Sequence, residues 1–168
     1  MKKTLLSLLA LLFTFSLSYS QAAQFKVPKK EHLDKGKQIA AEFFDNLKHK
    51  RHEVNADFIM STIGKSWDES QQITERNDYL NKFQLIAMES GLYGKLDSVD
   101  LIQEASLAGS ARYFRHAYLA YFDNSLLVFE FRFYVNPKEE VSLHYIGWSE
   151  TNPFEYMSTG DMVLPLYD

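Results

Sequence analysis

The sequence contains no cysteine among its 168 residues. Disulfide bonds are therefore excluded, and so is lipid attachment through an N-terminal cysteine. We also find no glycine-rich phosphate loop, no serine in a glycine-flanked elbow, no internal repeat and no low-complexity stretch. Side-chain packing must hold this chain together, and no single motif assigns a reaction to it.

The apolar run at the N-terminus lacks the length of a membrane span. Lys2 and Lys3 precede a run of roughly 13 residues, whereas a membrane helix needs about 20. Small residues follow at positions 18–23, which completes the order of a secretory signal peptide. We expect residues 1–22 to be this signal, cleaved after a position between 20 and 23, and the mature protein to be periplasmic or secreted. The alternative, an uncleaved anchor, is disfavoured by length.

Basic residues are in deficit. Removal of Lys2 and Lys3 leaves 16 basic against 22 acidic side chains, a net charge of −6. This balance argues against nucleic acid as a partner. The aromatic fraction of 15% is that of a chain that folds. About 145 residues form one ordinary domain, so we expect residues 23–168 to be a single domain without a membrane span.

Hydrophobic spacing predicts three helices, over residues 31–51, 55–63 and 74–90, with Asn55 and Thr74 as N-caps of the second and third. From residue 92 onward the period becomes alternating. Four strands are predicted over residues 94–107, 112–122, 125–136 and 140–149. Helices followed by a meander indicate the α+β class, with two to three N-terminal helices packed on a curved four-stranded antiparallel sheet.

A two-residue turn at Asp123 and Asn124 fixes the register of the central hairpin. Phe114 then lies opposite Phe133, and His116 opposite Phe131. The core face carries Phe114, His116, Tyr118, Leu127, Phe129, Phe131, Phe133 and Val135. The other face carries Arg115, Glu130, Arg132 and Tyr134, which we interpret as a solvated surface in which Glu130 neutralises both arginines.

The last strand breaks strict alternation. A bulge near His144 and Tyr145 would place four apolar side chains on the core face, and we prefer this register. They are Val141, Leu143, Ile146 and Trp148.

Several segments together resemble the nuclear transport factor 2-like (cystatin-like) superfamily, in particular its small exported bacterial members of unknown function. They are "GLYGKLDSVDL", "RYFRHAYLAYF", "LLVFEFRFYVNP" and "EEVSLHYIGW", and the resemblance spans residues 31–150. Val141 departs from it, because similar sequences often carry tryptophan there. The resemblance implies a sheet wrapped around the long third helix as a cone, whose open end is a pocket in many members. It does not assign a function, since the superfamily includes enzymes, oligomerisation modules and binding domains.

The candidate pocket is centred on His116 and Tyr118. A histidine on this face acts either as a general base or ligand-orienting group, or as a hydrogen-bonded core residue. Tyrosines such as Tyr79 and Tyr93 either donate to a ligand or pack. The pocket candidates are His116, Tyr118, Phe114, Phe131, Phe133, Phe83 and Trp148.

An enzyme would need a carboxylate beside His116 or Tyr118, and the predicted faces provide none unless Asp97 or Asp100 turns inward at a bulge. We therefore assign no catalytic residue. His49 and His52 are spaced like metal ligands, but the cations around them disfavour a metal, so we expect no metal site and no cofactor.

Three functions remain open. The first is an exported, non-catalytic binding or accessory domain that holds a small apolar ligand or a partner protein in an aromatic-lined cone or on its sheet. The second is a small isomerase or lyase using His116 and Tyr118. The third is a structural homodimer formed through the face of Arg115, Glu130, Arg132 and Tyr134. The apolar C-terminal stretch, about 150–168, packs across the sheet or the pocket mouth, or binds another subunit.

Overall fold

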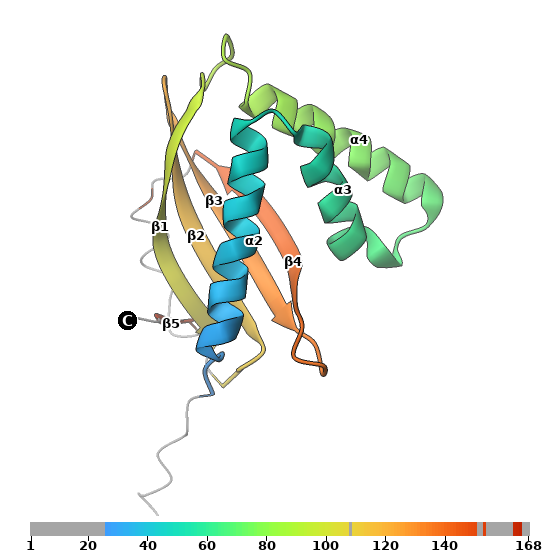
Figure 1. The fold of residues 1–168 in the computed structure, drawn as a ribbon, viewed down its shortest axis with the longest axis vertical. Helices are drawn as coiled ribbons and strands as arrows, with labels where there is room; N and C mark the ends of the chain where they lie inside the picture. The colour runs from blue at the N-terminus through green and yellow to red at the C-terminus, as the bar shows by residue number, and fades with distance from the viewer. Residues whose placement is uncertain (1–25, 108, 151–152, 154–162, 166–168) are drawn as a thin grey trace, which may run out of the picture.

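The structure is a computed structural model that describes residues 26–107, 109–150, 153 and 163–165. The predicted signal peptide and most of the apolar C-terminal stretch lie outside these residues. Helical segments come first and strands follow, so the predicted α+β class is confirmed (Figure 1). The elements are α2 (Lys30–Lys48), α3 (His52–Thr62), the 3-10 turn η1 (Ile63–Ser66), α4 (Glu69–Ile86), β1 (Leu96–Leu107), β2 (Tyr113–Phe122), β3 (Leu126–Val135), β4 (Val141–Ser149) and β5 (Val163–Pro165).

The boundary between the first two helices differs from the prediction. α2 ends at Lys48, because Lys50 adopts a left-handed φ of 58° that no α-helix tolerates. α3 begins at His52, and Asn55 is buried inside it instead of capping it. The Asn55 side chain donates to the Phe43 carbonyl oxygen at 2.9 Å and accepts from Asn46 Nδ2 at 3.1 Å. This amide therefore ties α3 to α2.

The last helix also begins earlier than predicted. Asp68 caps α4, its carboxylate accepting from the backbone N–H of Gln71 at 2.8 Å. Thr74, the predicted cap, lies one turn inside the helix and donates to the Ser70 carbonyl oxygen. An aspartate is a stronger cap than a threonine, which explains the choice.

The sheet is a meander with one addition. Its strand order is β4-β3-β2-β1-β5, and all pairs are antiparallel. The predicted hairpin register is confirmed, with Phe114 paired to Phe133 and His116 to Phe131. β4 contains the predicted bulge, because Arg132 pairs with Tyr145 whereas Phe133 pairs with Leu143. The unpredicted β5 pairs with the end of β1, so this part of the C-terminal stretch packs on its own domain.

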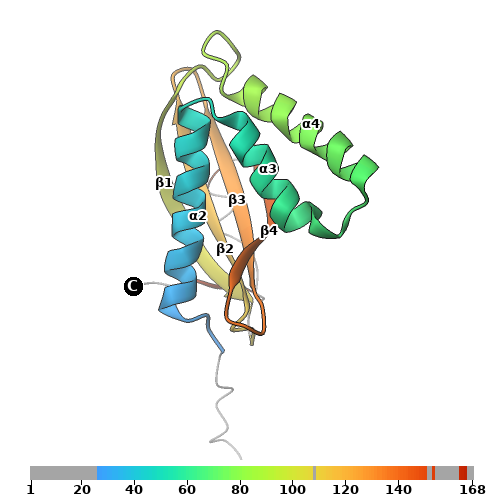
Figure 2. The same ribbon diagram turned by 45° about the vertical axis from the view of Figure 1, so that its right-hand side comes forward.

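The helix that fills the sheet is α2, and the expectation that the third helix does so is wrong. Figures 1 and 2 show α2 lying along the inner face of the sheet, with α3 and α4 beyond it. The rings of Phe43 and Phe131 lie 5.4 Å apart, and those of Phe44 and Phe129 lie 5.2 Å apart. From α4, Phe83 reaches the same cluster, 5.3 Å from the Phe43 ring. None of the described helices combines the length and apolar character that a membrane crossing requires.

Candidate functional site

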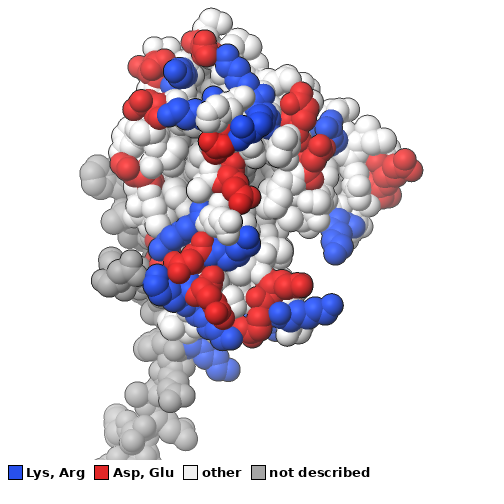
Figure 3. Space-filling model, viewed as in Figure 1, with Lys and Arg blue, Asp and Glu red and all other residues white. Residues whose placement is uncertain are grey.

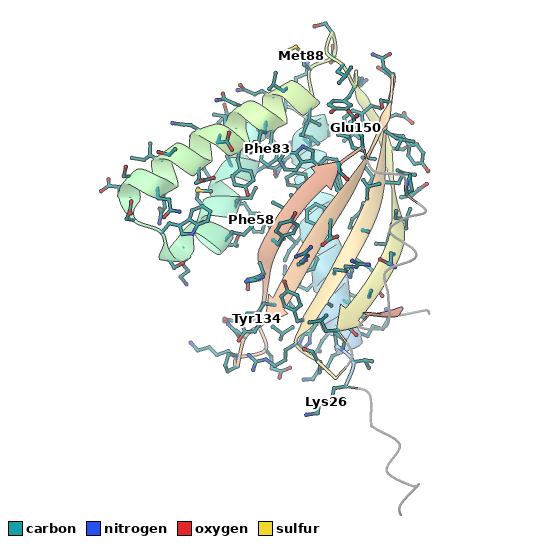
Figure 4. All side chains as sticks on the ribbon, turned by 180° about the vertical axis from the view of Figure 1, so that it is seen from behind. Lys26, Phe58, Phe83, Met88, Tyr134 and Glu150 are labelled. Atoms are coloured by element: carbon teal, nitrogen blue, oxygen red, sulfur yellow. The ribbon has the colours of Figure 1, made fainter. Side chains whose placement is uncertain are left out.

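The inner face of the sheet gathers every residue predicted to line a pocket. Phe114, His116, Phe131, Phe133 and Phe83 are fully or almost fully buried there, Tyr118 is buried, and Trp148 packs against Phe83 and Phe129 at the edge. Figure 4 shows Phe83 between α4 and the sheet. The α2 side chains described above contact this face directly, so the aromatic lining is part of a packed core.

Gly36 in α2 shows how closely helix and sheet approach beside His116. A Cβ atom at Gly36 would lie 2.8 Å from Phe114 Cε2 and 2.9 Å from His116 Cε1. Both distances are well inside van der Waals contact. Only glycine fits here, and side chains fill the space next to the imidazole.

His116 has a carboxylate neighbour that we did not predict, although neither of its ring nitrogens has a hydrogen-bond partner of acceptable geometry within the described residues. Glu104 of β1 lies opposite His116, with Oε2 3.2 Å from His116 Nε2. Lys37 of α2 reaches the same oxygen, with its Nζ at 3.0 Å. The side chains of His116, Glu104 and Lys37 are 0%, 9% and 33% exposed, so the network runs from the core to the surface.

β1 is irregular, as the alternative expectation required, but a different carboxylate turns inward. The register shifts between Leu96 and Ser98 and again between Leu101 and Gln103. The second shift places Glu104 on the inner face, whereas Asp97 and Asp100 are exposed. The polar pair formed by Glu104 and the facing histidine could be found only with the β1 register known.

Burial sets the protonation of this network. Desolvation lowers the pKa of His116 and outweighs the opposing effect of Glu104. Burial raises the pKa of Glu104, but the His116 ring and the Lys37 ammonium together outweigh it, and the net pKa is below the ordinary value. Burial also raises the pKa of the Tyr118 hydroxyl. Near neutral pH the network is therefore a neutral imidazole beside an ionised carboxylate and an ammonium.

Such a pair has the elements of general acid–base chemistry. A substrate would have to reach His116, which is fully buried beneath Gly36 and α2. In the structure, the contacts of Glu104 with His116 and Lys37 therefore compensate polar groups that are buried between α2 and the sheet.

The outer face of the sheet carries the other predicted cluster. Glu130 contacts Arg132 through its Oε1, and its Oε2 lies 3.8 Å from Arg115 Nη1, which agrees with the predicted neutralisation. The expectation of a solvated cluster is wrong for Glu130, which is only 5% exposed. A buried charge needs partners, and the two flanking arginines provide them.

Beside Glu130, three aromatic–cation or aromatic–histidine pairs lie toward the β3–β4 hairpin. The Arg132 guanidinium lies 4.3 Å from the centre of the Tyr145 ring, and Arg112 stacks 5.1 Å from that of Tyr134 and donates to its hydroxyl at 2.7 Å. We call these residues the Tyr–Arg face: Arg112, Tyr113, Arg132, Tyr134, His144 and Tyr145, the Tyr113 hydroxyl being 3.0 Å from His144 Nδ1.

The geometry of the Tyr–Arg face depends on the bulge in β4 and on Gly147. The bulge puts Tyr145 opposite Arg132. The Tyr145 ring lies over Gly147, where an added Cβ would be 2.8 Å from the ring Cζ. Tyr134 and Tyr145 remain 38% and 41% exposed, and Figure 4 shows Tyr134 at the hairpin end of the sheet.

A small hollow adjoins the Tyr–Arg face. Its volume is about 170 Å³, and Ala105 and Leu107 of β1 line it together with Tyr113, Arg115 and Arg132. This hollow combines an apolar floor with two guanidinium groups, a combination suited to an acidic or aromatic side chain of another molecule.

The predicted metal-like pair, His49 and His52, is not brought together on one helix. His49 follows the last residue of α2, and its Nδ1 lies 3.0 Å from Asp45 Oδ1. His52 is buried at the start of α3.

Comparison of the chain with family models, with curated proteins and with solved structures finds no match.

Proposed function

We propose that the protein is an exported, non-catalytic binding domain that holds a partner protein on the Tyr–Arg face. The observation that carries the proposal is the set of stacked, exposed tyrosines and arginines on the outer face, against an inner face packed by α2. Tyrosine and arginine dominate the residues that contribute most to protein–protein binding.

The charge of this face favours an acidic partner. Arg112, Arg115 and Arg132 outnumber Glu130, whose carboxylate is buried between Arg115 and Arg132, so these four described residues together carry two positive charges. The whole chain carries a net charge of −4. Self-association through this face would oppose like charges, which costs affinity, so a different, acidic protein fits better than a second copy.

An isomerase or lyase is the second candidate, and Glu104 favours it by placing a carboxylate oxygen 3.2 Å from His116 Nε2. The same histidine is fully buried and adjoins Gly36 closely. Turnover would require α2 to leave the sheet, and with it the Phe43 and Phe44 contacts. Binding outside the cone requires no such movement.

The test is capture of partners from the exported fraction with tagged protein. Tyr134→Ala with Tyr145→Ala should weaken capture by at least about thirtyfold, the effect of losing one hot-spot residue worth about 2 kcal/mol. Tyr121→Ala is the matched control, since this tyrosine lies near the opposite end of the same sheet and should leave capture unchanged. Equal capture by the double variant and the control would refute the proposal.

A further inference from the structure

Two carboxylates and a histidine meet where α2 begins and the β3–β4 hairpin turns. His32 Nε2 lies 3.2 Å from Glu139 Oε2 and 3.8 Å from Glu31 Oε1. One ligand atom from each of these three residues lies within 4.8 Å of the others. Figure 3 shows acidic and basic side chains crowded together at this end of the molecule.

His32 is the unusual member of the cluster. It is 5% exposed, and neither ring nitrogen has a hydrogen-bond partner of acceptable geometry within the described part of the chain. Buried polar atoms normally have such a partner, so the unpartnered His32 ring nitrogens are an exception that a bound ligand would remove. Its Nε2 points toward the two carboxylates, where a cation would bind.

A cationic group already lies at this point. The Lys29 ammonium is 2.5 Å from Glu139 Oε2 and 3.7 Å from Glu31 Oε1. Its side chain is largely exposed and can turn into solvent. The cluster thus selects positive charge.

The surroundings leave room for an ion and its water. A cavity of about 330 Å³ adjoins the cluster, lined by the three residues with Lys35, Glu140 and Val141. The hairpin is fixed by Asn136, whose Oδ1 accepts from the backbone N–H groups of Lys138 and Glu140 at 2.8 and 3.0 Å. Glu139, at a φ of 65°, is held between them.

We propose that Glu31, His32 and Glu139 form a binding site for a divalent transition metal of the zinc type, which displaces the Lys29 ammonium. One imidazole and two carboxylates provide three ligands and leave a fourth position for water, as zinc permits. Magnesium and calcium require six or more oxygen ligands and fit poorly. The bound ion would join the start of α2 to the β3–β4 hairpin, whose strands carry the Tyr–Arg face.

The test is titration of chelator-treated mature protein with Zn²⁺ by calorimetry, with Mg²⁺ as the comparison ion. We expect one Zn²⁺ per chain and no Mg²⁺ binding. Glu139→Gln should weaken Zn²⁺ binding by more than about tenfold. Losing a residue that only orients a metal ligand already costs about that much, and Glu139 is a proposed ligand itself. Lys29→Ala should strengthen it, because the competing ammonium is gone.

Matched variants keep the test decisive. His49→Ala removes an exposed histidine that lies 3.0 Å from Asp45 and should leave Zn²⁺ affinity unchanged. His32→Ala should abolish Zn²⁺ binding, and circular dichroism checks that this variant folds. Glu139→Gln changes a residue on the exposed hairpin, so the test does not depend on whether the His32→Ala protein folds. Absence of saturable Zn²⁺ binding, or binding lost in His49→Ala but kept in Glu139→Gln, would overturn the proposal.

Discussion

Gly36→Ala tests whether the inner face of the sheet is full. In an exposed helix interior, replacing glycine by alanine stabilises a protein by about 1 kcal/mol. Here the new methyl group would meet Phe114 Cε2 at 2.8 Å and His116 Cε1 at 2.9 Å, and both rings are fixed in the core. Overpacking of this kind costs about 1–3 kcal/mol.

The two effects oppose each other, and overpacking should prevail. We expect Gly36→Ala to lower the free energy of unfolding by about 1 kcal/mol. This is the middle of the range that remains when the gain from replacing a helical glycine is subtracted from the cost of overpacking. Urea unfolding should then show a midpoint lower by roughly 0.3–1 M with an unchanged slope. Thr74→Ala, at an exposed position of α4, is the control and should gain a few tenths of a kcal/mol. A Gly36→Ala protein more stable than wild type would mean that a cavity exists beside His116.

Two further predictions concern the buried histidine and the Tyr–Arg face. The folded-state pKa of His116 is lowered by burial, so its contribution to stability is complete above the unfolded value of about 6.5 and is lost as pH falls below it. His116→Gln should flatten the dependence of unfolding free energy on pH between about 5 and 7, leaving a part due to His52, whose pKa burial also lowers. An unaltered slope in His116→Gln would contradict the assigned neutral ring. Gly147→Ala should push the Tyr145 ring off the strand and weaken partner capture, and unchanged capture would show that the ring position is irrelevant.

The strand pairing could be read from the sequence because local rules determine it. The two-residue turn at Asp123 and Asn124 fixes which residues of β2 and β3 face each other, so Phe114 and Phe133 could be paired in advance. The bulge in β4 followed from the requirement that Leu143 and Ile146 share one face.

The first residues of the helices were harder to predict from the sequence. Asp68 and Thr74 are both acceptable caps, and the prediction passed over the stronger preference for aspartate, which decides where α4 begins. Asn55 has the composition of a cap but is used to bridge α2 and α3, a role that depends on tertiary packing.

The polar clusters escaped prediction because they join distant segments. Glu104 faces His116 only through two irregularities in β1, which leave no mark in hydrophobic alternation. Glu139 is more than a hundred positions from His32, and only the folded chain brings the hairpin to the start of α2. Neither juxtaposition has a spacing that a motif could capture.

Native mass spectrometry of the wild-type protein from the exported fraction tests the central functional claim most directly. Binding on the outer face predicts a complex with an intact acidic protein and a free chain without a retained small molecule. A retained apolar ligand of a few hundred daltons, present equally in the Tyr134→Ala and Tyr145→Ala double variant, would contradict it, because such a ligand would have to occupy the space that α2 fills in the structure.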